Sequence, residues 1–299
     1  MLRLLALLAL ATFVYCDFDQ KLHNKYLSMG EDEFVEYFNS RDYSYTIKNY
    51  DFRPAVSMVN YSIPESVPVI SYNDSLLADL PDNFDSRKKW PHCVTIGEIY
   101  NQGNCGSCWA FGTANTASDR ICTQNNRTVR LSVQDFNCFD DYVCGGNEPF
   151  QAFQYYLNPG LVTQECKPYD VEYLKKFKCD KKCVNGDVYD IDKRRGDLYW
   201  RVDSQEESIK TELFNNGPIE VSFRVYEDFM KYSGGIYEHK YGHAAGGHSV
   251  RMIGYGVENG VPYWLVANSW GTNWGEQGFF RVKRYDKDLQ FELQLLTVL

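Results

Sequence analysis

The sequence predicts an α+β protein in which a helix-rich part precedes a sheet-rich part. Between Cys105 and about Gly160 the apolar residues recur with helical spacing, whereas from Ile219 onward they alternate with polar residues, as in strands. The chain of 299 residues is 44% apolar and 16% aromatic. It can therefore bury a substantial core, either in one large domain or in two closely packed lobes.

Three helices are expected, over 108–121, 150–157 and 204–216. The second ends at an Asn-Pro-Gly sequence, which cannot continue a helix. The third begins at Ser204, where Glu207 three residues later completes a capping box, and it ends at a Gly-Pro pair.

The strand expected after the third helix has a strict period of two. Ile219, Val221, Phe223 and Val225 alternate with a polar set formed by Glu220, Ser222 and Arg224. This alternation predicts a half-buried strand with its polar side chains facing solvent. Another strand is expected over 279–284.

A hairpin is expected around Asn259-Gly260, because a type I′ turn needs positive φ at both central residues. A two-residue turn there pairs Asn268 with Arg251 and leaves His248 three residues away, roughly 10 Å along the strand. Side chains at such an odd offset face opposite sides of a sheet. If His248 and Asn268 meet, we expect a bulge between them, near Gly254 or Gly256.

The first sixteen residues have the order of a secretory signal, with Arg3 before an apolar run from Leu4 to Val14. A short membrane anchor is the alternative, although the run is short for a membrane span. Cleavage after Cys16 leaves an odd number of cysteines. In an oxidising compartment one thiol would then stay free, and a free thiol in a secreted chain is a candidate reactive group.

Residues 17–79, called the leader below, are rich in Tyr, Asn, Ser and acidic residues and contain no cysteine. This composition suggests a separable segment. Glycosylation sequons begin at Asn60 and Asn73 in the leader and at Asn126 beyond it. The net charge of −9 and the absence of a long basic stripe argue against nucleic acid as a partner.

The residues for thiol chemistry are present. Cys108 starts a predicted helix, where the positive end of the helix dipole favours a thiolate. His248 opens a strand after two glycines and could accept the thiol proton, and Asn268 at the same end of the hairpin could fix the imidazole tautomer.

Other interpretations of these residues remain open. Cys105 and Cys108 could form a redox CxxC pair, or half of a zinc site completed by Cys179 and Cys183. His239 and His243 have the spacing of a helical ligand pair, but glycines around them argue against a helix.

Three motifs resemble those of the papain family of cysteine proteases: QGNCGSCWAF at 102–111, GGHSV at 246–250 and NSWGTNWG at 268–275. The resemblance runs from about Leu80 to the end, and within the family it is strongest to the cathepsin B branch. It implies a papain-like fold of two lobes with a cleft between them. The helical lobe would span roughly 80–190, and an antiparallel, barrel-like sheet lobe roughly 191–299.

The same resemblance implies a cysteine endopeptidase that acts through a Cys108 thiolate, a His248 base and an acyl-enzyme, with no cofactor and no metal. A catalytically inactive binding protein on this scaffold is the alternative. The resemblance implies five further roles, shared by six residues: an oxyanion donor, a shield for the His248–Asn268 contact, substrate-backbone binding, a primed-side contact and a pocket residue. These are Gln102, Trp270, Gly145 with Gly146, Trp274 and Gln294, respectively.

The family pattern also implies four disulfides, which leave Cys108 unpaired, although sequence alone allows 105 connectivities for eight cysteines. The implied pairs are Cys93–Cys122, Cys105–Cys144, Cys138–Cys179 and Cys166–Cys183.

The resemblance implies an inactive precursor in which the leader inhibits the enzyme until it is removed. The expected partners are peptide or protein substrates, the leader itself and cystatin-like inhibitors. The mature protein is expected to be a monomer without a membrane span, in a lysosome-like vacuole or secreted.

Two departures from the cathepsin B branch bear on specificity. The loop between Cys166 and Cys179 is short and has no histidine with which to grip a substrate's terminal carboxylate. We therefore expect endopeptidase action and little removal of dipeptides. Gln294 replaces an acidic pocket residue, which argues against arginine two residues before the cut.

Overall fold

The computed structural model describes residues 18–57, 63–72, 80–176 and 178–299. The predicted signal segment 1–16 and the sequons at Asn60 and Asn73 lie outside these residues, whereas Asn126 is exposed. No helix in the described part is both long and apolar enough to cross a membrane.

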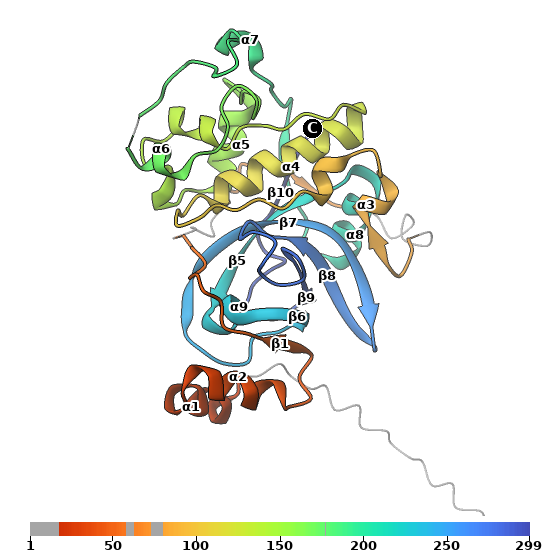
Figure 1. Ribbon diagram of the computed structural model, residues 1–299. Helices are drawn as coiled ribbons and strands as arrows, with labels where there is room; N and C mark the ends of the chain where they lie inside the picture. The colour runs from red at the N-terminus through yellow and green to blue at the C-terminus, as the bar shows by residue number, and fades with distance from the viewer. Residues whose placement is uncertain (1–17, 58–62, 73–79, 177) are drawn as a thin grey trace, which may run out of the picture.

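Helices α3 to α7 gather on one side of the molecule around the long helix α4, whereas α8 and α9 lie beside the strands (Figure 1). The alanines and aromatic residues of α4 share a core with α5, and Leu296 and Val298 from the end of the chain join this core. The helices beyond the leader are α3 Ser86–Lys89, α4 Cys108–Asn125, α5 Pro149–Leu157, α6 Val171–Lys176, α7 Tyr189–Asp192, α8 Glu206–Asn216 and α9 Glu227–Lys231.

The three predicted helices are thus present as α4, α5 and α8. The capping box predicted at the start of α8 is wrong, because the N-cap is Gln205 and no side chain caps the helix. Its first turn carries Glu206 and Glu207, whose negative charges favour the helix N-terminus.

The other side of the molecule is a ten-stranded sheet in the order β1-β6-β9-β8-β7-β5-β10-β4-β2, with β3 paired to β7. It is open and mixed rather than an antiparallel barrel, because β6 runs parallel to β9 and β2 parallel to β4. The strands are β1 Tyr45–Ile47, β2 Val69–Ile70, β3 Phe84–Asp85, β4 Tyr199–Val202, β5 Ile219–Tyr226, β6 Tyr232–Tyr237, β7 Ala244–Glu258, β8 Val261–Ala267, β9 Phe279–Lys283 and β10 Leu295–Val298.

Strand β5 is buried on both faces, so the prediction of a half-buried strand is wrong. Glu220 is 0% exposed and Ser222 is 3% exposed, because α4 packs over the face that carries them. Polar residues on one face of a strand indicate that this face is exposed to solvent only when no helix covers it. The periodicity of the strand sequence carries no information about such a helix.

The hairpin has the predicted turn and the predicted bulge. Asn259 and Gly260 have φ of 52° and 78°, as a type I′ turn requires. The ladder between β7 and β8 shifts register between Met252 and Gly254, so that Arg251 pairs with Ala267. The extra residue turns the start of β7 so that His248 faces the end of β8.

The leader packs along the sheet side and then enters the space between the two sides (Figure 1). Its helices are α1 Gln20–Ser28 and α2 Glu31–Asn39, its strand β1 pairs with β6, and its strand β2 pairs with β4. Phe34 and Phe38 are buried against the ring of Tyr241, with ring centroids 4.8 and 5.6 Å away.

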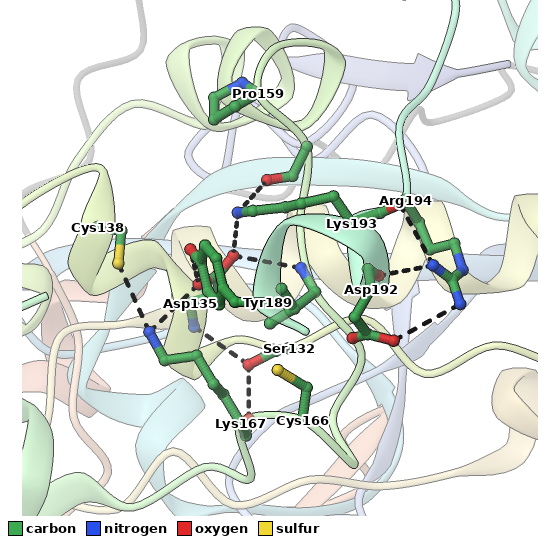
Figure 2. A network of polar contacts seen from close by, with 12 residues as sticks. Ser132, Asp135, Cys138, Pro159, Cys166, Lys167, Tyr189, Asp192, Lys193 and Arg194 are labelled. Carbon is green, nitrogen blue, oxygen red and sulfur yellow. Dashed lines mark hydrogen bonds and ion pairs between the residues drawn. The ribbon is translucent and has the colours of Figure 1, made fainter. Parts of the chain in front are cut away.

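A buried polar network fastens the segment around α7 to the helical side (Figure 2). The carboxylate of Asp135 accepts hydrogen bonds from Lys167 Nζ at 3.2 Å, Lys193 Nζ at 2.6 Å and the Tyr189 hydroxyl at 2.6 Å. All three donors are buried side chains, so the buried carboxylate is compensated by opposite charge and hydrogen bonds. Lys167 directly follows Cys166, so the network also holds the base of the short 166–179 loop.

Candidate active site

Cys108 is the first residue of α4 and is 0% exposed. It is the one free cysteine in the described part of the chain. Its Sγ lies 3.1 Å from the hydroxyl of Ser57 in the leader, and the backbone N–H groups of Ser249 and Trp109 also donate to it. The nucleophile candidate therefore sits at a helix N-terminus, among hydrogen-bond donors.

The remaining eight described cysteines form the four pairs that the resemblance implies, with S–S distances from 1.95 to 2.04 Å. Cys105 is bonded to Cys144, so it is not the redox partner of Cys108. Cys179 and Cys183 are bonded to other cysteines and have no thiolate to offer to zinc. These disulfides remove the redox and zinc alternatives.

His248 and Asn268 meet as expected. The ring atom Nε2 lies 2.7 Å from Asn268 Oδ1, which also accepts the backbone N–H of Ser269 at 2.8 Å. Because that N–H fixes Oδ1 as the acceptor, Nε2 must carry the ring proton and Nδ1 is the basic atom. No protein group in the described residues occupies Nδ1. The imidazole is thus in the tautomer that can accept a proton.

Trp270 covers this contact. Its ring stacks on His248 with 4.5 Å between the ring centroids and 27° between the planes. The indole is also part of the hydrophobic core on the sheet side. The shielding role that the resemblance implies for Trp270 stays a prediction.

Gln102 is 0% exposed, and its Nε2 donates to the carbonyl of Cys105, three residues before the nucleophile candidate, at 2.8 Å. Ser269 Oγ donates to its Oε1 at 2.6 Å, which leaves Nε2 as the outward donor. Nε2 donates to the carbonyl of Ala55 in the leader at 3.2 Å, and Trp270 Nε1 donates to the same oxygen at 3.1 Å. A leader carbonyl therefore occupies the position where these donors could stabilise an oxyanion.

The leader passes through the cleft as an extended segment. Ser57 forms both backbone hydrogen bonds of an antiparallel bridge with Gly247, at 3.0 and 2.8 Å. A cleft of about 970 Å³ remains beside residues 52–56, bordered by Asn101, Asn104, Tyr142 and the loop residue Lys175. The thiol itself is covered.

The buried site holds both candidate catalytic groups in their neutral forms. Burial raises the pKa of the Cys108 thiol, although hydrogen bonds from Ser57, Ser249 and Trp109 oppose the change. Burial also lowers the pKa of His248 to about 4, against the opposing hydrogen bond to Asn268. Both shifts have the same cause, because loss of water disfavours the charged form of each group.

The other substrate-binding candidates lie around the cleft at different depths. Trp274 is 0% exposed and packs against Trp270 rather than bordering the open cleft. Gly145 and Gly146 follow Cys144, which does border it. Gln294 lies below Ile63 of the leader, in a nearly filled pocket. The roles of these four residues stay predictions.

Sequence reasoning missed several residues that hold the site together. Tyr169 contacts both Ser107 Oγ, at 3.0 Å, and the Gln102 carbonyl, at 2.8 Å. Ser269 orients Gln102 and Asn268. Ser269 stands inside a recognised motif and could have been found there, whereas Tyr169 and Ser57 carry no local signal.

The comparisons with known proteins agree with this geometry. A family model described as papain family cysteine protease matches residues 80–297. The chain belongs to this family. Its relatives include cathepsin B-like cysteine proteinase 6 of Caenorhabditis elegans, 41% identical over 72% of this chain and 65% of the relative. The cathepsin B-like cysteine proteinase of Schistosoma japonicum is 38% identical over 77% of this chain and 76% of the relative.

Among solved structures of the papain family, procathepsin B S9 from Trypanosoma congolense has a TM-score of 0.78 and 30% identity. The structural alignment covers 89% of this chain and 96% of the T. congolense chain. The expected resemblance to the cathepsin B branch is confirmed. The alignments span 65% of cathepsin B-like cysteine proteinase 6 and 64% of cathepsin B-like cysteine proteinase 3, both of C. elegans, slightly less than two thirds of their lengths.

Proposed function

We propose that this chain is the precursor of a cysteine endopeptidase in which Cys108 is the nucleophile and His248 the base. One observation carries the proposal: Asn268 fixes the imidazole with Nδ1 unprotonated, on the residue directly before Ser249, whose backbone N–H donates to the free thiol. The backbone next to His248 thus contacts the thiol directly.

The reaction would proceed in two halves. Cys108 transfers its proton to His248 Nδ1, and the thiolate attacks the substrate's carbonyl carbon while Gln102 Nε2 donates to the oxyanion. The imidazolium then protonates the leaving amine as the C–N bond breaks. Water, deprotonated by the imidazole, hydrolyses the thioester and restores the thiol.

The leader is proposed as the intramolecular inhibitor, with the catalytic domain beginning at about residue 80. Two contacts support this. The carbonyl of Ala55 accepts a hydrogen bond from Gln102 Nε2, and the hydroxyl of Ser57 contacts the Sγ of Cys108. We further propose that residues 1–16 are a signal peptide that directs the chain into the secretory pathway, with a vacuole or secretion as its destination. The mature form is proposed to be a monomer that cystatin-like proteins inhibit.

Endopeptidase action is supported by the 166–179 loop. Among its described residues it has no histidine, and the disulfide at one end and the Asp135 network at the other hold it. We propose that internal peptide bonds are the substrates and that Gln294, in place of a carboxylate, gives little preference for arginine.

The test is turnover of an internally quenched peptide by the processed protein, with Cys108→Ser as the matched control. We expect internal cleavage that the control lacks. A processed, folded protein that binds peptides without cutting them would support the inactive binding protein instead. Release of terminal dipeptides as the main product would contradict the endopeptidase proposal.

A further inference from the structure

A buried carboxyl contacts Ser249, the residue after His248, and has no part in the reaction described above. Glu220 on β5 is 0% exposed, and its Oε1 accepts the hydroxyl of Ser249 as well as that of Ser222, the latter at 3.1 Å. Its Oε2 has no partner among the described residues. A buried acidic group with one unpartnered oxygen is unusual enough to need a reason.

The contact to Ser249 connects Glu220 to the reacting atoms. Ser249 follows His248 on β7, and its backbone N–H donates to the Sγ of Cys108. Its hydroxyl points the other way, to Glu220. One serine therefore contacts the nucleophile through its backbone and the buried carboxyl through its side chain.

Helix α4 closes tightly over this pair. Gly112 lies one turn after Cys108, and a Cβ at this position would lie 2.2 Å from Ser249 Oγ and 3.1 Å from Glu220 Cγ. The backbone of the Cys108 helix thus rests directly on the Glu220–Ser249 contact. The separation between the thiol on α4 and the imidazole on β7 depends on this layer.

Glu220 also faces the pocket that holds Ile63 of the leader, together with Phe150, Ser222 and Gln294. Removal of the leader takes Ile63 away and uncovers this floor. Glu220 thus borders the pocket lined by Ile63 and also contacts β7, the strand that carries His248.

We propose that Glu220 is a positioning residue of the active site, which holds Ser249 and thereby fixes β7 against the Cys108 helix. The inference rests on the roles proposed above for Cys108 and His248. A neutral carboxyl suits this task, because an anion here would oppose formation of the Cys108 thiolate.

The charge state follows from the surroundings. Burial raises the pKa of Glu220 to about 8, although the hydroxyls of Ser249 and Ser222 oppose the change. Arg251 is its register partner on β7, but the guanidinium bonds to Asp119 of α4 and to backbone carbonyls. From β10 and α5, Leu296 and Phe150 contribute no charge. Across the interface with α4, Glu220 also acts on Cys108, whose thiol pKa it raises.

The experiment compares pH profiles of kcat and KM for processed wild type, Glu220→Gln and Ser249→Ala. Glutamine matches the shape of the neutral acid, so we expect Glu220→Gln to keep activity within about threefold at acidic pH. As the pH rises through the raised pKa of Glu220, we expect wild type to lose activity, because the ionised carboxyl opposes formation of the Cys108 thiolate. Glu220→Gln should keep activity, moving the alkaline midpoint up by about half a pH unit or more.

Ser249→Ala should lower kcat about tenfold with little change in KM, since the anchor is lost but the pocket remains. Glu212→Gln is the matched control: Glu212 is also 0% exposed but pairs with Arg120 at 2.7 Å. It should lower thermal stability and leave the alkaline midpoint where it is.

Identical alkaline midpoints for wild type and Glu220→Gln, or a uniform loss at all pH values, would overturn the inference. If Glu220→Gln fails to fold, the separate effects of Ser249→Ala on kcat and KM decide. A raised KM with an unchanged kcat in Ser249→Ala would count against the inference. Absence of Cys108-dependent turnover in wild type would instead refute the proposed function.

Discussion

At the scale of single residues, the precursor stores its reactive groups in an unreactive state. The leader's Ser57 hydroxyl contacts the Cys108 thiol, and the carbonyl of Ala55 accepts a hydrogen bond from Gln102. Burial keeps Cys108 as a thiol, and His248, with a pKa of about 4, stays neutral above that pH. A neutral thiol is a weak nucleophile, so activation requires water and substrate to replace the leader.

Replacing Gln102 tests the oxyanion role. In Gln102→Ala the donor Nε2 is lost, and we expect kcat to fall about 10²- to 10³-fold with a smaller change in KM. Steady-state kinetics of the processed enzyme measure this. Gln205→Ala, an exposed glutamine without a capping bond, is the control. A change in KM alone would show that Gln102 only binds substrate.

At the scale of secondary-structure elements, the site is a contact between one helix and one hairpin. Helix α4 presents Cys108 from its N-terminus, and β7 presents His248 after a bulge that corrects the side on which it faces. The tolerance of this contact is small, because α4 approaches β7 at a glycine.

Gly112→Ala should disturb that contact. The added methyl would overlap Ser249 Oγ, so we expect a loss of about 1–3 kcal/mol in the free energy of unfolding and reduced kcat. Denaturant unfolding and turnover measure the two effects. Gly97→Ala, where the nearest atom to the new Cβ is Arg87 Cδ at 3.8 Å, should be close to neutral. Equal effects of the two substitutions would show that the close approach is unimportant.

The elements show what local sequence can and cannot predict. The bulge near Gly254 was predictable, because His248 and Asn268 could lie on the same face of the hairpin only if one strand carried an extra residue between the turn and His248. The burial of Glu220 was not, because the helix that covers it lies about a hundred residues earlier in the chain. The capping box at Ser204 failed because the chain enters α8 one residue later, at Gln205.

Distant contacts set a similar limit for the site. Cys108, His248, Asn268 and Gln102 lie in recognisable motifs, and the structure brings them together. Ser57 and Tyr169 reach the site from segments without a motif, through tertiary packing alone. Their positions required coordinates.

At the scale of the whole molecule, the leader is held on both sides of its extended cleft segment. Its helices bury Phe34 and Phe38 against the sheet, and β2 pairs with β4 beyond the cleft. The extended segment between them contacts the thiol. Inhibition should therefore depend on packing far from the cleft.

Phe34→Ala tests this dependence. Truncating a ring that is 1% exposed should weaken docking of the leader by about 3–5 kcal/mol and speed the appearance of peptidase activity in the full precursor. Leu27→Ala on α1, where the side chain is 62% exposed, should mature at the wild-type rate. Unchanged maturation in Phe34→Ala would mean that the cleft segment alone maintains inhibition.

The most direct test of the account is the alkylation rate of Cys108 by iodoacetamide between pH 5 and 7, in the precursor and after leader removal, mapped by mass spectrometry. The account predicts slow modification of the buried thiol in the precursor and a rise of at least about tenfold at Cys108 in the processed enzyme. Equal rates in the two forms, or modification at a different cysteine, would contradict it.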